Sequence, residues 1–175
     1  MYVTSREGNK KAYIIEYSLS KPFDISTATI SFTGGSPKGT ALTCDAEGVD
    51  QMQLPHAIEF KPDGTRMFIT SNKNFGKGNT DVAVYQFKLT TPFDLRSGVT
   101  PGEISGSLAT SDTSMRNIQF NSDGTALYVA GDTNARMNKY TLSTAYDITT
   151  LSSTFSTFDL GSRAVSYTHL TLPTT

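Results

Sequence analysis

His56 is the strongest candidate for a chemically active side chain in this sequence. The chain has two histidines and a single cysteine, Cys44. A thiol beside an imidazole is the arrangement used in thiol catalysis, but one residue of each kind gives little support for it. A lone cysteine more often packs as a small apolar side chain. We therefore predict no catalytic residues and interpret His56 as a polar binding residue, with a structural hydrogen-bonding role as the alternative.

A short segment rich in carboxylates is the second feature with possible chemistry. Asp45, Glu47 and Asp50 lie within six residues of one another. Oxygen-rich loops of this kind can hold Ca²⁺, but the spacing differs from that of an EF-hand loop. The sequence therefore predicts neither a metal site nor a cofactor.

Cations and one aromatic residue form a third candidate group. The segment 72–79 is rich in glycine and asparagine and carries two lysines and a phenylalanine. An exposed ring among amides and cations can stack on a sugar or on a peptide side chain. The alternative is that these are solvated loop charges, with the ring folded onto its own sheet. The predicted ligand-binding residues are His56, Lys73, Phe75, Lys77, Arg116 and Arg136.

The chain repeats itself, and the repeat must position these residues. Phe-Lys-Pro-Asp-Gly-Thr at 60–65 returns as Phe-Asn-Ser-Asp-Gly-Thr at 120–125. The segment 17–25, which ends in Pro-Phe-Asp-Ile, returns in similar form at 87–95 and 140–148. Repetition in a fixed order indicates an array of one supersecondary unit.

Each unit is predicted to be an antiparallel meander of four strands, which we call a, b, c and d. Apolar and polar residues alternate in strand a, as Ile58 and Phe60 do with Glu59, and no stretch has a sustained helical period. An Asp-Gly turn joins strands a and b. The aromatic-Asp turn joins c and d, with the carboxylate accepting from backbone N–H groups and the aromatic ring wedged between neighbouring sheets. The predicted strands are a at 58–60 and 118–120, b at 2–5, 67–70 and 127–130, c at 13–19, 82–89 and 137–142, and d at 29–33, 102–108 and 153–158.

Tandem four-stranded units are typical of β-propellers. The motifs at 60–69 and 87–95 resemble the degenerate WD40-like, Phe-Ser-Pro-Asp-Gly-Thr type of propeller repeat found in environmental bacteria and phages. The chain has no tryptophan, so the Trp-Asp signature of WD40 repeats is missing. The resemblance implies an all-β fold, a partial propeller of about 2.7 blades divided at 1–54, 55–113 and 114–164. Because a closed propeller needs roughly four to eight blades, we expect the chain to be part of a longer one.

The last eleven residues depart from the repeat pattern. Residues 165–175 resemble a translated sequencing adapter, and an ordinary final strand is the alternative. We therefore expect this segment, including His169, to be foreign to the natural protein and to carry no function.

Loop lengths indicate which end of the sheets meets a ligand. The a–b and c–d connections are constant between units, whereas the aromatic residues of strands b and c are 15, 19 and 12 residues apart (2–17, 68–87 and 128–140). In a meander the a–b and c–d turns share one end, and the b–c and d–a loops share the other. Variable loops gather on the binding face of repeat proteins. We therefore predict a ligand at the b–c and d–a end.

Composition limits the partners. The net charge is −1 and charged residues make up 18% of the chain, so nothing favours nucleic acid. No apolar run is long enough for membrane insertion, and one cysteine cannot form an intrachain disulfide framework. We predict a non-enzymatic recognition or scaffold module for a protein or carbohydrate, extracellular or virion-associated rather than cytoplasmic. The alternative is part of a propeller enzyme of the lactonase or quinoprotein kind, with its site in other blades.

Overall fold

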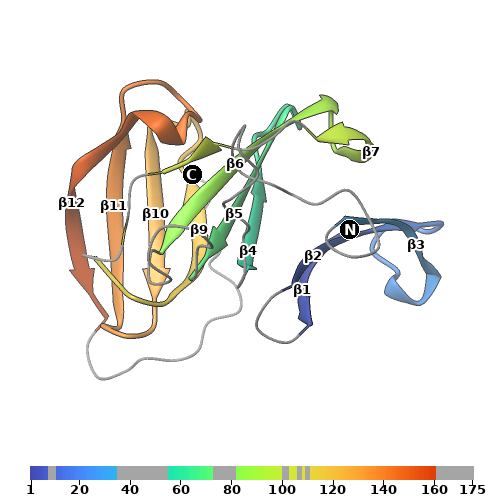
Figure 1. Ribbon diagram of the computed structural model, residues 1–175, viewed down its shortest axis with the longest axis horizontal. Coiled ribbons are helices and arrows are strands. Elements are labelled where there is room, and N and C mark those ends of the chain that lie inside the picture. The colour runs from blue at the N-terminus through green and yellow to red at the C-terminus, as the bar shows by residue number, and fades with distance from the viewer. Residues whose placement is uncertain are drawn as a thin grey trace.

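The computed structural model is an all-β arrangement of three antiparallel sheets, none of which closes into a barrel (Figure 1). The sheets follow one another in chain order across the view. The structure describes residues 1–7, 11–34, 55–72, 82–99, 103–105, 108 and 111–160. No α-helix occurs among these residues, as expected for a chain rich in the β-branched and aromatic residues that favour strands.

Sheet 1 has three strands in the order β1-β2-β3. They are β1 (Tyr2–Glu7), β2 (Lys11–Leu19) and β3 (Ala28–Gly34). A single 3₁₀ turn, η1 (Ile25–Thr27), connects β2 to β3. These strands correspond to the predicted strands b, c and d of the first unit.

Sheet 2 contains five strands. The order β4-β5-β6-β7 is supplemented by β8, which also pairs with β6. The strands are β4 (Pro55–Phe60), β5 (Arg66–Ser71), β6 (Ala83–Thr91), β7 (Asp94–Val99) and β8 (Glu103–Ile104).

Sheet 2 departs from the prediction around its strand d. The sequence predicted one strand over 102–108, and among the residues described there (103–105 and 108) the structure has β8, with an additional strand, β7, before it. The reason is that β6 extends to Thr91, so that the hairpin continues past the turn and Leu89 pairs with Val99.

Sheet 3 is a complete four-stranded meander, β9-β10-β11-β12. Its strands are β9 (Met115–Phe120), β10 (Ala126–Gly131), β11 (Arg136–Leu142) and β12 (Leu151–Asp159). The 3₁₀ turn η2 (Ile148–Thr150) precedes β12, as η1 precedes β3.

The Asp-Gly turns of sheets 2 and 3 have the same hydrogen bonds. Gly64 N donates to the Lys61 carbonyl at 2.8 Å, and Gly124 N donates to the Asn121 carbonyl at 3.1 Å. Both glycines have positive φ, +72° and +75°, a conformation that residues with a Cβ rarely adopt. The prediction that Asp63 and Asp123 belong to turns is confirmed, since each accepts from the N–H two residues on, at 3.0 and 2.9 Å.

The three c–d turns also share one geometry. Asp24, Asp94 and Asp147 accept from the N–H two residues on, at 3.1, 2.9 and 3.1 Å, which confirms the predicted turn role. The aromatic residue before each aspartate has a positive φ: 62° for Phe23, 58° for Phe93 and 55° for Tyr146.

The predicted wedge between sheets describes Tyr146, which is buried in the cluster between sheets 2 and 3, and is wrong for Phe23. The Phe93 and Tyr146 rings lie where a Cβ on Gly64 or Gly124 would be, so each ring covers the glycine of the neighbouring a–b turn. Lys61 Nζ of the preceding sheet lies 6.0 Å from the Tyr146 ring centroid, and the Tyr2 hydroxyl of sheet 1 donates to the Phe93 carbonyl. Phe23 is 98% exposed.

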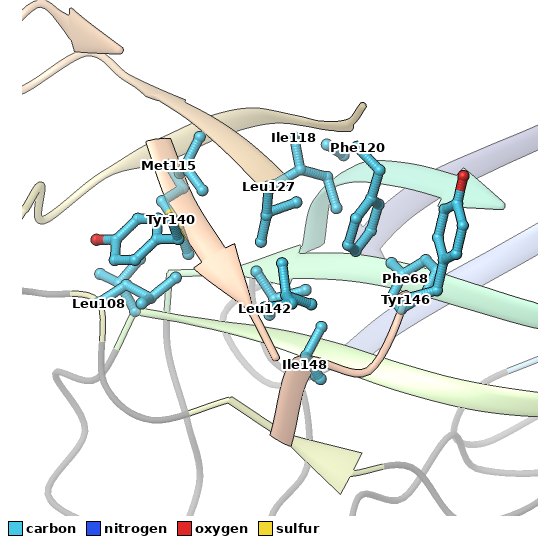
Figure 2. Packing of buried hydrophobic residues seen from close by; sticks show 14 residues of the cluster. Phe68, Leu108, Met115, Ile118, Phe120, Leu127, Tyr140, Leu142, Tyr146 and Ile148 are labelled. Atoms are coloured by element: carbon cyan, nitrogen blue, oxygen red, sulfur yellow. The ribbon is translucent and has the colours of Figure 1, made fainter. Parts of the chain in front are cut away.

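The core lies between the sheets. One buried cluster joins Phe68 and Val84 of sheet 2 to Ile118, Leu127 and Tyr140 of sheet 3, and Figure 2 shows Phe68 among the side chains of sheet 3. The other cluster joins Ile14 of sheet 1 to the opposite face of sheet 2. Each sheet therefore covers the next through alternating apolar residues.

Two sets of aromatic rings recur at these sheet-to-sheet contacts. In each, a strand-a phenylalanine lies between the strand-b aromatic of the preceding sheet and the turn aromatic of its own sheet. The sets are Tyr2, Phe60 and Phe93, with centroid distances of 4.5 and 5.6 Å, and Phe68, Phe120 and Tyr146, with distances of 4.5 and 5.2 Å. Contacts of this kind add to the stabilisation from burial.

Side-chain acceptors on strand c also reach the next sheet in an equivalent way. Glu16 Oε2 accepts from Leu95 N at 3.1 Å, and Gln86 Oε1 accepts from Ile148 N at 3.2 Å. Both acceptors are buried. Sheets 1 and 2 therefore meet as sheets 2 and 3 do.

Glu59 connects the inner strands β4 and β9. Both of its carboxylate oxygens lie 3.1 Å from Phe120 N. Burial raises the pKa of the Glu59 carboxyl from 4.5 to about 7, while the hydrogen bond from Phe120 acts in the other direction. The residue at the same place in sheet 3, Gln119, cannot ionise.

The Glu59 position makes stability depend on pH. Because its pKa is higher in the folded chain, the folded state holds the proton more tightly, and the free energy of unfolding falls as pH rises from 4.5 to about 7. After allowance for partial exposure, we expect a loss of about 1–2 kcal/mol. Urea unfolding at pH 5 and pH 8 measures it, with Glu59→Gln as the matched variant. Equal pH dependence in both proteins would contradict this expectation.

Candidate functional site

The candidate site lies at the b–c and d–a end of sheets 2 and 3, where His56 and Arg116 meet. Arg116 Nη1 is 3.2 Å from His56 Nδ1 and 3.3 Å from Nε2. Each residue is the second of its strand, β4 or β9. The sequence placed both before strand a, and this boundary is corrected, because the strands begin three residues earlier than predicted. Equivalent positions in two units thus supply neighbouring side chains.

Asp132 completes the cluster. Arg116 Nε donates to Asp132 Oδ2 at 2.6 Å, and about half of each side chain is exposed. Partial burial acts to raise the pKa of the Asp132 carboxyl, but hydrogen bonds with Ser114 and Arg116 outweigh it and lower the pKa. The cluster therefore presents a guanidinium, a carboxylate and an imidazole to solvent.

The backbone beneath the cluster is held by a buried aspartate. Asp112 is fully buried, and its oxygens accept from Ser114 N at 2.8 Å and Asn134 N at 3.1 Å. This fixes the segment before β9 against the β10–β11 connection, which carries Asp132. Asp112 was not predicted, although an Asp followed two residues on by Ser or Thr is the pattern of four of the five turns described above.

The amide side chain of Asn72 joins sheet 2 to the start of β9, at the same end of sheet 3. Asn72 Oδ1 accepts from Met115 N at 2.8 Å, directly before Arg116. On the other side, Thr4 Oγ1 of sheet 1 donates to the His56 carbonyl at 3.2 Å. All three sheets therefore contribute to the positions of His56 and Arg116.

The remaining predicted site residues are not brought to this cluster. Arg136 is exposed at the start of β11, at the same end of sheet 3. Lys73, Phe75 and Lys77 lie outside the described residues, as do Cys44 and the carboxylates at 45–50. The tail at 165–175 lies outside them as well.

The described part of the chain contains no group of three His, Cys, Asp or Glu side chains that could hold a metal ion. Its helices are also too short to cross a membrane.

No protein-family model matches the chain, and searches of curated proteins and of solved structures found no significant match. The resemblance to WD40-like repeats therefore depends on the motifs within this sequence.

Proposed function

We propose that the three sheets are successive blades of a partial, propeller-like array that recognises a protein or carbohydrate ligand at its b–c and d–a end. The equivalent turns, aromatic sets and acceptor contacts between sheets support the array. The meeting of His56 with Arg116, from equivalent positions in two sheets, is the observation that carries the binding site.

The chemistry of this cluster suits a polar ligand. Arg116 uses Nε on Asp132 and Nη1 on His56, and its side chain stays 46% exposed, so that donors remain in contact with solvent. Asp132 offers acceptors beside them. Adjacent donors and acceptors match the vicinal hydroxyls of a sugar or the amides of a peptide backbone. A guanidinium already oriented by a carboxylate loses less entropy on binding.

Replacing Arg116 with alanine tests the site. We expect at least about a tenfold loss of affinity for any glycan or protein that the intact chain retains on a glycan array or in a binding titration. Arg96→Ala is the matched control, because Arg96 also pairs with an aspartate, Asp94, but at the c–d turn end. Equal binding by the wild-type chain and the Arg116 variant would overturn the proposed site, as would equal losses in both variants.

A further inference from the structure

The outward face of sheet 1 is apolar, and no described part of the chain covers it. Its free face comprises Val3, Phe23, Ile25 and Ile30, which are 38%, 98%, 74% and 64% exposed. The equivalent residues of sheet 3, Val129, Tyr146 and Ile148, are at most 7% exposed, because sheet 2 covers them. The first sheet therefore presents the kind of surface that the other sheets bury, and such patches mark interaction sites.

The outward face of sheet 3, at the other end of the array, corresponds to the face of sheet 2 that covers sheet 3. Its free face comprises Gln119, Tyr128, Lys139 and Phe158. The first three occupy the places held in sheet 2 by Glu59, Phe68 and Gln86. Tyr128 is paired with Lys139 in register as Phe68 is with Gln86.

One buried polar atom on this face has an unmet hydrogen bond. Gln119 Oε1 has no partner among the described residues, whereas Glu59 at the same place accepts from the backbone of the adjoining sheet. Phe158 is 66% exposed on the same face. The exposed Phe158 ring fits a face that another sheet covers, whereas the described part of sheet 1 has no strand a to supply Gln119 with the donor that Phe120 N supplies to Glu59.

Charge also matches between the two free faces. At the internal contact, Arg66 Nη1 of sheet 2 lies 3.9 Å from Asp147 Oδ2 in the turn of sheet 3, with Gln86 beside it. On the free face of sheet 3, Ala126 holds the place of Arg66 and a cation, Lys139, holds the place of Gln86. On sheet 1, Asp24 holds the place of Asp147 and lies 3.5 Å from Lys21 Nζ. Docking the two faces as the internal sheets dock would bring Lys139 to Asp24.

We propose that copies of this chain associate head to tail, with the free face of sheet 3 of one copy covered by the free face of sheet 1 of the next. The contact repeats the packing between successive sheets within the chain. It joins two different surfaces, so that association continues until a ring closes or a chain of copies forms. This association uses the two outer faces and does not depend on ligand binding at the b–c and d–a end of the sheets.

Sedimentation velocity of the full chain and two variants tests this association. Ile25→Glu places a charge on the sheet 1 face, and Lys139→Glu reverses the charge on the sheet 3 face. Ile25 lies next to the capping Asp24 but does not cap, and Lys139 is exposed, so both variants should keep the fold, which circular dichroism checks. Arg136→Glu, at the rim of the same strand as Lys139, is the control.

The wild-type chain and the control should form concentration-dependent species larger than the 18.9 kDa monomer. Each face variant alone should associate at least about tenfold more weakly. An equimolar mixture of the two should form a dimer and nothing larger, because each variant keeps the face that the other lacks. A wild-type chain that stays monomeric at about 100 μM, or a mixture that stays monomeric, would overturn the proposal. If Ile25→Glu weakened association and Lys139→Glu did not, the chain would form a two-fold dimer through its sheet 1 faces, and the head-to-tail proposal would be contradicted.

Discussion

Replacing Phe120 with alanine is expected to lower the free energy of unfolding by about 3–5 kcal/mol, the range for large aromatic residues in a core. Phe120 is 6% exposed and lies between Phe68 of sheet 2 and Tyr146 of its own sheet, with ring centroids 4.5 and 5.2 Å away. The substitution removes the side chain that joins two sheets, and the rings around it cannot both close the resulting cavity. Urea unfolding monitored by circular dichroism measures the loss.

Phe158→Ala is the matched control for this prediction. Phe158 is also a strand phenylalanine of sheet 3, but it is 66% exposed on the face away from sheet 2. We expect a change within about 0.5 kcal/mol, as for other surface substitutions, at a concentration where the protein is monomeric. A loss below about 1 kcal/mol for Phe120→Ala would show that sheets 2 and 3 do not pack through this ring.

Gly124→Ala is expected to cost about 3 kcal/mol or more. Gly124 has a φ of +75°, where a Cβ is strained, and that Cβ would overlap the ring of Tyr146. The Tyr146 ring is 7% exposed and its hydroxyl donates to the Ser122 carbonyl at 3.0 Å, so it has little room to move. The strain and the displaced ring both destabilise sheet 3.

Gly64→Ala tests the same prediction, because it should destabilise the protein less than Gly124→Ala. Gly64 has nearly the same φ, +72°, and its Cβ would overlap Phe93. Phe93 is 44% exposed and can swing into solvent, so we expect a smaller loss of about 1–2 kcal/mol from backbone strain. Thermal unfolding of both variants gives the ranking, and a larger loss at Gly64 than at Gly124 would contradict the packing described for Tyr146.

The repeat in the sequence predicted most of the fold because local chemistry determines its elements. Asp-Gly at 63–64 and 123–124 favours a turn with positive φ, and the alternation of Ile118, Gln119 and Phe120 indicates a strand with one buried face. The roles of Asp24, Asp94 and Asp147 followed from carboxylates that accept from the backbone nearby. All of these are contacts within a few residues, which one sequence can reveal.

Features that depend on contacts between distant residues could not be predicted in this way. Strand β7 pairs with the extended end of β6, where Leu89 lies opposite Val99, although its first two residues, Asp94 and Leu95, match the Asp-Ile of the other c–d turns. The Asp112 contact with Ser114 is local and its pattern could have been recognised, but the contact with Asn134, 22 residues away in the β10–β11 connection, could not. At the site, alignment placed His56 and Arg116 in equivalent positions, but only the packing of β4 against β9 brings them within 3.2 Å.

The most direct test of the repeated sheet-to-sheet packing is a nuclear Overhauser measurement between aromatic rings in a chain with labelled phenylalanine and tyrosine. Equivalent sheets stacked in order require ring-to-ring contacts in two separate pairs, Tyr2 with Phe60 and Phe68 with Phe120, whose centroids are both 4.5 Å apart. We expect cross-peaks for both pairs. The absence of either pair, or cross-peaks joining Phe60 directly to Phe120 in their place, would contradict the array.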